Sequence, residues 1–327
     1  MIVGAPDRLL LEGTVVTPDV AFEGEVLVEG DTITCVEAGD ACASRPGAEG
    51  ATVVETNGVI APGLIDTHNH ILFDVFDERH WTPPTLYADH TEWTSDARYE
   101  QTLDVKQCLS DDSQGKPDWC AQTPYGTAAG SLRCELDKFG EIKGLIAGTT
   151  SIVGLPGTSA ACFGSLARSV DVAQNGLGQD RVRTSAVFPP STSSADSVCA
   201  GFGSTVDAYL VHCGEGIDER AAGELQKLQT ASTTDGCLLA PGTTITHAVA
   251  FSPSDFALLA AHGVNITWSP RSNVTLYGAT TDIPSALDAG VTVALGPDWS
   301  MGGSQNMLDE LRFADAWDDA DFGDRLA

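Results

Sequence analysis

The chain has 327 residues, of which 42% are hydrophobic and 19% charged, so it can bury the core of one large domain with a small appendage. Its formal net charge of −29 at pH 7 argues against nucleic-acid and anionic-membrane partners. No apolar run approaches the length of a membrane helix, so we expect no membrane insertion. We expect a globular protein that acts on a small molecule, and a homo-oligomer remains open.

The first part of the chain is typical of short strands. Residues 9–59 are rich in Val, Thr and Ile, and Gly, Asp and Pro interrupt them. This pattern predicts a small β-sandwich unit over residues 1–59. The first eleven residues contain neither a basic segment nor a long apolar one, so no signal peptide is visible.

Strand and helix patterns alternate over residues 60–327, as they do in parallel βα units. Eight candidate strands predict a (β/α)8 barrel of the TIM type, although residues 165–172 fit a strand or a helix equally well. The candidate strands are 59–70, 149–156, 165–172, 181–190, 207–216, 242–249, 264–273 and 291–300. The candidate helices are 134–148, 218–232, 252–263, which opens with a serine cap, and 283–290.

Residues from about 71 to 140 interrupt this alternation. They contain Trp81, Trp93 and Trp119, several prolines and many acids, without clear periodicity. We predict a long insertion after the first barrel strand, placed to cover the site. His80 and His90 lie in this insertion, where we expect solvated loop positions rather than substrate contacts.

Histidines gather where predicted strands end. His68 and His70 flank Asn69 at the end of the first barrel strand, and residues i and i+2 of a strand face the same side. Alone, such a pair is more often structural or at the surface than a metal site. His212 and His247 also end apolar segments, so four of the seven histidines occupy strand ends. This placement favours one shared site at the barrel mouth.

Asp298 ends the last candidate strand and completes a set of metal ligands. Three imidazoles, from His68, His70 and His212, together with one carboxylate suit zinc, with iron or manganese as alternatives. We predict one divalent metal, which lowers the pKa of a bound water from about 15.7 towards about 7. Asp298 would also accept a proton from this water.

Two further strand-end residues suit proton transfer. His247 can hydrogen-bond the attacking water and orient it. Glu215, three residues after His212, can carry a proton to the leaving group or to a ring nitrogen.

Five motifs in order, PGLIDTHNH, HCGEG, ITH, SPRSN and LGPD, resemble those of the amidohydrolase superfamily. The resemblance spans about residues 9–315 and is closest to the branch of cytosine and guanine deaminases, triazine chlorohydrolases and imidazolonepropionase. It implies a metal-dependent hydrolase on a barrel. The implied metal ligands are His68, His70, His212 and Asp298, and the implied catalytic residues are Glu215, His247 and Asp298.

Two departures refine this resemblance. Binuclear relatives usually bridge two metals with a carboxylated lysine on the fourth strand, and no lysine occurs between Lys143 and Lys227, which favours a single metal. Relatives also continue past the eighth strand and return to complete the small β unit. That return is missing here, so the N-terminal strands would lack partners and a truncated fragment is one interpretation.

Three residues near the expected mouth are substrate candidates. Arg271 could bind a substrate carboxylate or pair with an acid of the protein, Asn273 would shape the mouth, and Trp299 could line the pocket or pack beneath it. The glycines of residues 157–165 match no phosphate-loop spacing, so we assign no nucleotide cofactor.

The nine cysteines contain no C-x-x-C pair, which argues against a zinc ribbon or a thioredoxin-type site. Cys35 and Cys42, and likewise Cys108 and Cys120, are close enough in sequence to close short disulfide loops. This cysteine content favours a periplasmic or secreted location over the cytoplasm. The odd count leaves a cysteine outside any intrachain pair, and Cys213 is the candidate, with packing favoured over a nucleophilic role.

The pattern as a whole predicts hydrolysis of a non-peptide C–N bond. A metal-activated water would attack an sp² carbon, to deaminate a heterocycle or to open a cyclic amide. One alternative is a peptidase or acyl-amino-acid hydrolase that cleaves a linear amide. The other is a non-catalytic barrel fragment that acts as a binding protein.

Overall fold

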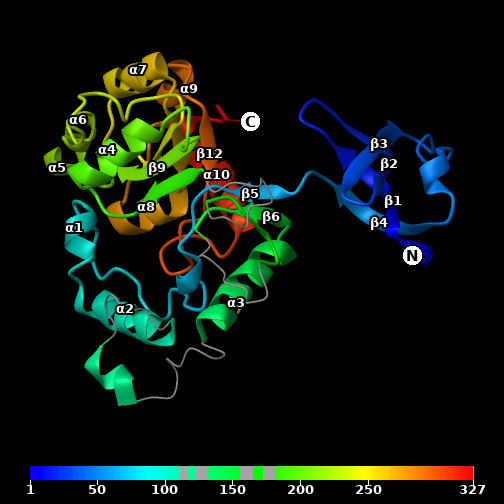
Figure 1. Cartoon of the computed structure of the whole chain (residues 1–327), viewed down its shortest axis with the longest axis horizontal. Coiled ribbons are helices and arrows are strands. Elements are labelled where there is room, and N and C mark those ends of the chain that lie inside the picture. The colour runs from blue at the N-terminus through cyan, green and yellow to red at the C-terminus, as the bar shows by residue number, and fades with distance from the viewer. Residues whose placement is uncertain (111–116, 123–131, 155–164, 172–180, 327) are drawn as a thin grey trace. The chain divides into compact units, whose positions relative to one another are not determined.

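A computed structural model describes residues 1–110, 117–122, 132–154, 165–171 and 181–326. The chain divides into two compact units, Met1–Gly63 and Leu64–Ala327 (Figure 1). The sequence placed this boundary at residues 59 and 60. Within the described residues, no helix is both long and apolar enough to cross a membrane.

The first unit is a four-stranded sheet in the order β3-β2-β1-β4. Its strands are β1 (Ala5–Val16), β2 (Ala21–Glu29), β3 (Thr32–Ala38) and β4 (Ala51–Ile60), and η1 (Pro46–Ala48) precedes β4. Strands β1 to β3 are antiparallel neighbours, whereas β4 runs parallel to β1. Leu10, Leu27 and the Cys35–Cys42 disulfide form its small core. The described residues of this unit form one sheet, so the second layer of a sandwich stays a prediction.

The second unit has a TIM-barrel-like α/β fold, and its described residues form eight strands in chain order, one within each candidate segment. Strands β8 to β12 form one parallel sheet and β5 to β7 another. Backbone hydrogen bonds from Asp298 to His68 (N···O 3.0 Å) and from His70 to Asp298 (2.6 Å) join the ends of the two sheets. No ladder joins β7 to β8 in the part of the chain that the structure describes. The strands are β5 (Leu64–Asp66), β6 (Thr149–Ile152), β7 (Arg168–Ser169), β8 (Val182–Ser185), β9 (Ala208–Cys213), β10 (Thr243–His247), β11 (Asn265–Trp268) and β12 (Val293–Leu295).

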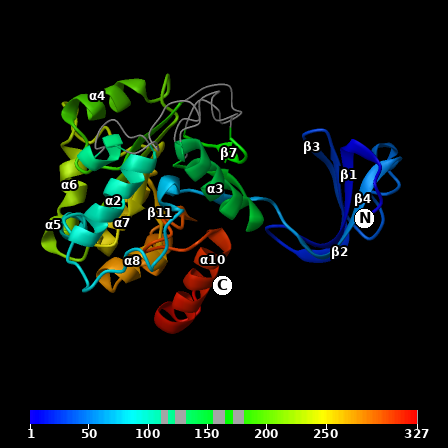
Figure 2. The ribbon, with the colours of Figure 1, turned by 90° about the horizontal axis from the view of Figure 1, so that it is seen from below.

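Helices cover the five-stranded sheet and form the main core with it (Figures 1 and 2). Apolar side chains such as Val198, Leu228, Phe256 and Ala286 pack against Val211, Ile245 and Ile266 of the strands. Burial of this apolar surface is the chief stabilising contribution. The covering helices are α4 (Thr192–Gly201), α5 (Glu219–Ala222), α6 (Glu224–Gln229), α7 (Pro253–His262) and α9 (Ile283–Asp288). After β12 follow α10 (Met307–Trp317) and the π-helical turn η6 (Asp318–Phe322).

Two predicted elements are corrected by the structure. The single helix expected over residues 218–232 is split into α5 and α6 at Gly223, a residue of poor helix propensity. The strand expected over residues 264–273 ends at Trp268, and helix α8 (Pro270–Tyr277) begins at once. Pro270 suits the first helical turn because its missing N–H has no intrahelical partner there.

The insertion contains more helix than the sequence indicated. Its described elements are η2 (Ile71–Phe73), α1 (His90–Trp93), α2 (Ala97–Leu109) and η3 (Asp118–Gln122). Helix α3 (Leu132–Ile146) follows and confirms the helix expected over residues 134–148. Asp96 caps α2 by accepting hydrogen bonds from the backbone N–H groups of Arg98 and Tyr99. Trp81, Trp93 and Tyr99 pack around Trp299, which follows the last strand. This aromatic cluster attaches the insertion to the barrel beside the site.

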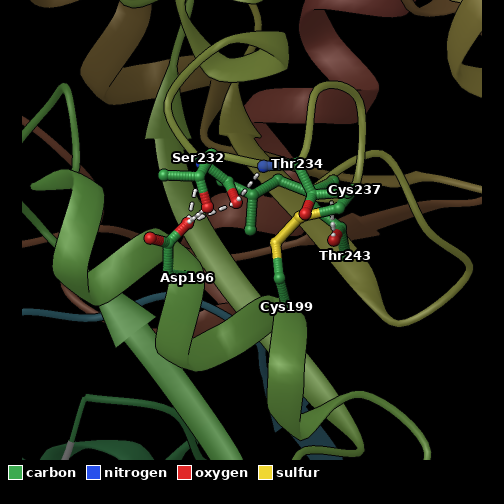
Figure 3. Close-up of a disulfide and its surroundings, with 8 residues drawn as sticks. Asp196, Cys199, Ser232, Thr234, Cys237 and Thr243 are labelled. Atoms are coloured by element: carbon green, nitrogen blue, oxygen red, sulfur yellow. Dashed lines mark hydrogen bonds between the residues drawn. A yellow bond between two sulfur atoms is a disulfide. The ribbon is translucent and has the colours of Figure 1, made fainter.

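The predicted short disulfides Cys35–Cys42 and Cys108–Cys120 are confirmed. A third disulfide, which the sequence did not indicate, joins Cys199 of α4 to Cys237 (Figure 3). Cys213 is buried and forms no disulfide, as predicted.

Candidate active site

The predicted site residues converge at the carboxyl ends of the barrel strands. The Nε2 atom of His68 lies 3.0 Å from Oδ1 of Asp298, and that of His70 lies 3.5 Å from the same oxygen. The ring of His212 lies 4.7 Å from that of His68 and 5.2 Å from that of His247, between centroids. Four imidazoles and one carboxylate therefore form a single cluster.

The backbone is unusual at two of these positions. His247 has φ 77° and Asp298 has φ 69°, in the left-handed region that residues other than glycine seldom adopt. Such conformations cost about 1–3 kcal/mol and persist where the surrounding structure enforces them. Gly296 allows the close approach of the strand ends, since a Cβ there would lie 2.6 Å from the backbone nitrogen of His68. The unfavourable backbone conformations of His247 and Asp298 thus lower the folding stability, and they direct both side chains into one site.

The electrostatics favour neutral imidazoles beside an ionised carboxylate. Burial and the neighbouring His68 lower the pKa of His70 to about 4, and burial lowers the pKa of His212 well below its ordinary value. Burial alone would raise the pKa of Asp298, but its hydrogen bond with His68 and the surrounding imidazoles hold this pKa well below its usual range. Unprotonated nitrogens and a carboxylate are the states that bind a divalent cation.

Neighbouring groups orient these side chains. The Nδ1 atom of His212 lies 3.2 Å from the carbonyl oxygen of Ser185. Because a carbonyl only accepts, Nδ1 carries the proton and Nε2 keeps its lone pair. Ser272 donates a hydrogen bond to Oδ2 of Asp298, which leaves Oδ1 towards the histidines.

Two sets of three residues place their donor atoms within 4.8 Å of one another: His68, His212 and His247, and His68, His70 and Asp298. The predicted ligands all belong to these sets. His247, which was predicted to orient water, lies as close to His68 and His212 as the predicted metal ligands lie to one another. Its Nδ1 is 2.9 Å from Oδ1 of Asn273, which fixes the orientation of the ring.

A cavity of about 230 Å³ opens beside the cluster and contains Glu215. Oε2 of Glu215 lies 3.7 Å from Nε2 of His247. A second cavity, of about 290 Å³, reaches His68, His70 and His212 and is also lined by Lys106. The predicted proton carrier thus shares the first cavity with the metal-ligand candidates His70, His212 and Asp298.

The three substrate candidates occupy different environments. Trp299 lines the smaller cavity and is also packed against the insertion. Asn273 is fully buried and holds His247. Arg271 lines none of the described cavities, and its backbone N–H lies 3.3 Å from Oε1 of Glu310. Residues 157–164, for which the sequence indicated no nucleotide site, lie outside the described residues.

Sequence reasoning missed five residues of the insertion that line the smaller cavity: Phe73, His90, Trp93, Thr94 and Tyr99. His90 was expected in a solvated loop, but it is largely buried and its Nε2 lies 2.9 Å from Oε1 of Glu224. The one available signal was the aromatic content of the insertion. His80, by contrast, lies at the surface beside Asp77.

Comparisons with known proteins agree with this geometry. Residues 204–319 match the family model described as "Amidohydrolase family". The chain is 27% identical to 5-methylthioadenosine/S-adenosylhomocysteine deaminase of Natronomonas pharaonis, over 92% of this chain and 71% of that protein. It is 25% identical to the protein of the same description from Haloarcula marismortui, over 94% and 73%.

Solved structures share the fold. An atrazine chlorohydrolase mutant from Arthrobacter aurescens, complexed with zinc and atraton, matches with a TM-score of 0.66 and 17% identity, over 96% of this chain and 77% of that chain. A guanine deaminase from C. acetobutylicum with bound guanine matches with a TM-score of 0.58 and 13% identity, over 96% and 81%.

Proposed function

We propose that the chain, whose residues 204–319 match the amidohydrolase family model, is a metal-dependent hydrolase that deaminates an amino-substituted heterocycle. The observation that carries the proposal is the convergence of strand-end histidines and Asp298 on one cavity that also contains Glu215. These residues are separated by up to 230 positions in the sequence, and the barrel brings them together.

We propose a single divalent metal, zinc in the first place, held by His68, His70, His212 and Asp298. The donor set fits such an ion, because lowered pKa values keep His70 and His212 unprotonated while Asp298 stays ionised. When bound, the metal lowers the pKa of a coordinated water and polarises the substrate.

Side chains of the protein orient the attacking water and transfer its proton to the leaving group. His247, held at Nδ1 by Asn273, presents Nε2 to the cavity and orients the attacking water. Asp298 offers an ionised oxygen as a proton acceptor. Glu215 receives the proton that Asp298 has taken from the attacking water. It delivers this proton to the leaving amine, which departs as ammonia when the C–N bond breaks.

The smaller cavity supports a flat, partly apolar substrate. Phe73, Trp93, Tyr99 and Trp299 contribute rings to its wall, and aromatic rings pack favourably against planar heterocycles. The relatives described as deaminases of 5-methylthioadenosine and S-adenosylhomocysteine agree with a purine-type substrate.

Metal content tests the first half of this proposal. We expect about one zinc, iron or manganese per chain by elemental analysis of protein purified without added metal, and loss of it in His68→Ala/His70→Ala. His262→Ala is a matched control, because His262 is exposed at the end of α7, away from the site. Two metals per chain would contradict the single-metal site. Folded protein that binds no metal on reconstitution would favour a non-catalytic barrel.

Product analysis tests the second half. Ammonia release from 5-methylthioadenosine, adenosine or guanine would establish deamination, whereas a new primary amine from a linear amide would establish a peptidase-like activity. Glu215→Gln should abolish turnover and keep the metal. Glu219→Gln, an exposed change four residues away, should leave turnover unaffected.

We also propose a periplasmic or secreted location. Three described disulfides support it, since such bonds persist in oxidising compartments. Fractionation of the source cells, with alkylation of free thiols before lysis, would test it. A reduced protein in the cytoplasm would contradict it.

A further inference from the structure

We infer that Tyr277 is a positioning residue that selects which oxygen of Glu215 exchanges protons with the substrate, and that Trp93 of the insertion sets the direction of its hydroxyl. This inference rests on the proposed role of Glu215. It arises from a chain of two consecutive hydrogen bonds, one of them fully buried, that the sequence did not indicate.

The chain has two short links. The indole N–H of Trp93 donates to the hydroxyl oxygen of Tyr277 at 2.7 Å. The same hydroxyl lies 2.7 Å from Oε1 of Glu215. Tyr277 is 1% exposed and Glu215 is 5% exposed, so water competes little for either group.

The chemistry of the three groups fixes the direction of the chain. An indole N–H can only donate, and an ionised carboxylate can only accept. Because the Tyr277 oxygen already accepts from Trp93, its own proton points to Oε1 of Glu215. A proton on Oε1 would meet the Tyr277 hydroxyl donor to donor, and a buried unpaired donor is costly.

The two oxygens of Glu215 therefore have separate tasks. Oε1 is occupied by the Tyr277 hydroxyl, whereas Oε2 faces Nε2 of His247 across 3.7 Å. The distance between Oε2 and His247 exceeds that of a hydrogen bond, and Glu215 lines the smaller cavity, so Oε2 is the oxygen left to meet a substrate or water there. We assign proton exchange to Oε2.

The backbone of Glu215 is held by contacts other than the hydrogen bonds of Trp93 and Tyr277. The N–H of His90 donates to the carbonyl of Glu215 at 3.2 Å, and that of Ile217 donates to the carbonyl of Ala88 at 2.7 Å. Gly214 donates its N–H to Glu224 at 2.7 Å. With the main chain anchored, loss of the Tyr277 hydroxyl should free the carboxylate to rotate without moving the loop.

Trp93 and Tyr277 come from different parts of the chain that pack closely together. Trp93 ends α1 in the insertion, and Tyr277 ends α8 of the barrel. The N–H of Tyr87 also donates to the carbonyl of Leu276 at 2.8 Å. The insertion thus contributes to orienting the proton carrier, beyond forming a wall of the cavity.

Tyr277→Phe is the decisive variant, because it removes the hydroxyl and keeps the ring. With the purine that the wild type turns over, we expect kcat to fall about 100-fold, as for a displaced catalytic group, while KM changes less than about threefold. Metal content should be unchanged. The matched control Tyr87→Phe, which removes a hydroxyl bonded to Asp96 within the insertion, should keep wild-type kcat. An unchanged kcat in Tyr277→Phe would overturn the inference.

A double-mutant cycle tests the link to Trp93. Trp93→Phe removes the N–H, and as a single variant it should lower kcat. In the double variant it should cause no further loss of kcat beyond that of Tyr277→Phe. Additive losses would show that the two residues act separately and would contradict the chain. Trp93→Phe also provides the test if Tyr277→Phe fails to fold.

A crystal structure of Tyr277→Phe gives a readout that needs no turnover. We expect the Glu215 carboxylate to rotate while residues 214–217 keep their backbone positions. An unrotated carboxylate would refute the inference even if the protein is an active deaminase. Wild-type protein that releases no ammonia would refute the proposed function, whatever the carboxylate does.

Discussion

The Cys199–Cys237 disulfide is expected to stabilise the second unit more than either short disulfide stabilises its surroundings. It joins α4 to the segment that follows α6 across a sequence separation of 38, and the same segment is tied to α4 by Ser232, which donates to Asp196 at 2.6 Å (Figure 3). In the loop-closure model, a loop of this length contributes about 4 kcal/mol. For the separation of 7 between Cys35 and Cys42, the same model gives about 2 kcal/mol.

The perturbation is Cys199→Ala/Cys237→Ala, and the assay is urea unfolding followed by tryptophan fluorescence. All six tryptophans lie in the second unit, so the fluorescence reports on that unit alone. A loss of about 4 kcal/mol should lower the urea midpoint by more than about 1 M. The matched control, Cys35→Ala/Cys42→Ala, removes a disulfide from the first unit and should leave this fluorescence transition in place.

Two results would refute the reasoning. A loss below about 1 kcal/mol in Cys199→Ala/Cys237→Ala would mean that loop closure is not the source of stability. A control variant that shifts the tryptophan transition as strongly would mean that the two units do not unfold separately.

Three further predictions concern the site and its support. Gly216→Ala should destabilise the protein by more than the about 1–3 kcal/mol of an unfavourable backbone conformation, because its φ is 145° and a Cβ would lie 2.6 Å from the carbonyl oxygen of Ala88; Gly236→Ala, with φ 75° and no atom within 4 Å, is the control for urea unfolding. Burial raises the pKa of Glu310 from 4.5 to about 7. The folded protein therefore binds this proton more tightly than the unfolded chain does, and it loses stability as the pH rises from about 4.5 to about 7. Glu310→Gln should therefore stabilise the protein by up to about 3 kcal/mol at pH 8 and by less at pH 5.5, and an equal gain at both pH values would contradict this cause. Chelation should lower the melting temperature of the wild type, since ligand at 100 times its Kd contributes about 2.7 kcal/mol, and it should leave His68→Ala/His70→Ala unaffected; equal shifts in both proteins would argue against this metal site.

Sequence patterns were informative where one local rule decides the structure. Strand β9 contains His212 next to its last residue, β10 ends at His247, and Asp298 follows three residues after the end of β12. Parallel strands bring such ends to one edge, so the site followed from the strand assignment. The serine cap before α7 was equally local, and Ser252 forms a capping box with Asp255.

The remaining features depend on contacts that no local pattern encodes. Helix α2 was missed because it buries only Tyr99, Thr102 and Cys108, which do not form a continuous apolar stripe. The bond between Trp93 and Tyr277 spans 184 positions, and its partners become neighbours only when the insertion packs on α8. Whether a polar side chain holds a site residue or faces substrate, as with Asn273, likewise depends on the folded neighbours.

The antiparallel bridge between Asp89 and Gly216 limits how this protein can be redesigned. Exchanging the whole insertion for that of another barrel would remove backbone partners of the loop that carries Glu215, and a loss of activity would then say little about substrate choice. Junctions placed outside residues 86–93 would keep those partners and allow the outer part of the insertion to be varied. In a recombination library, this segment should therefore be inherited together with residues 214–217 as one block.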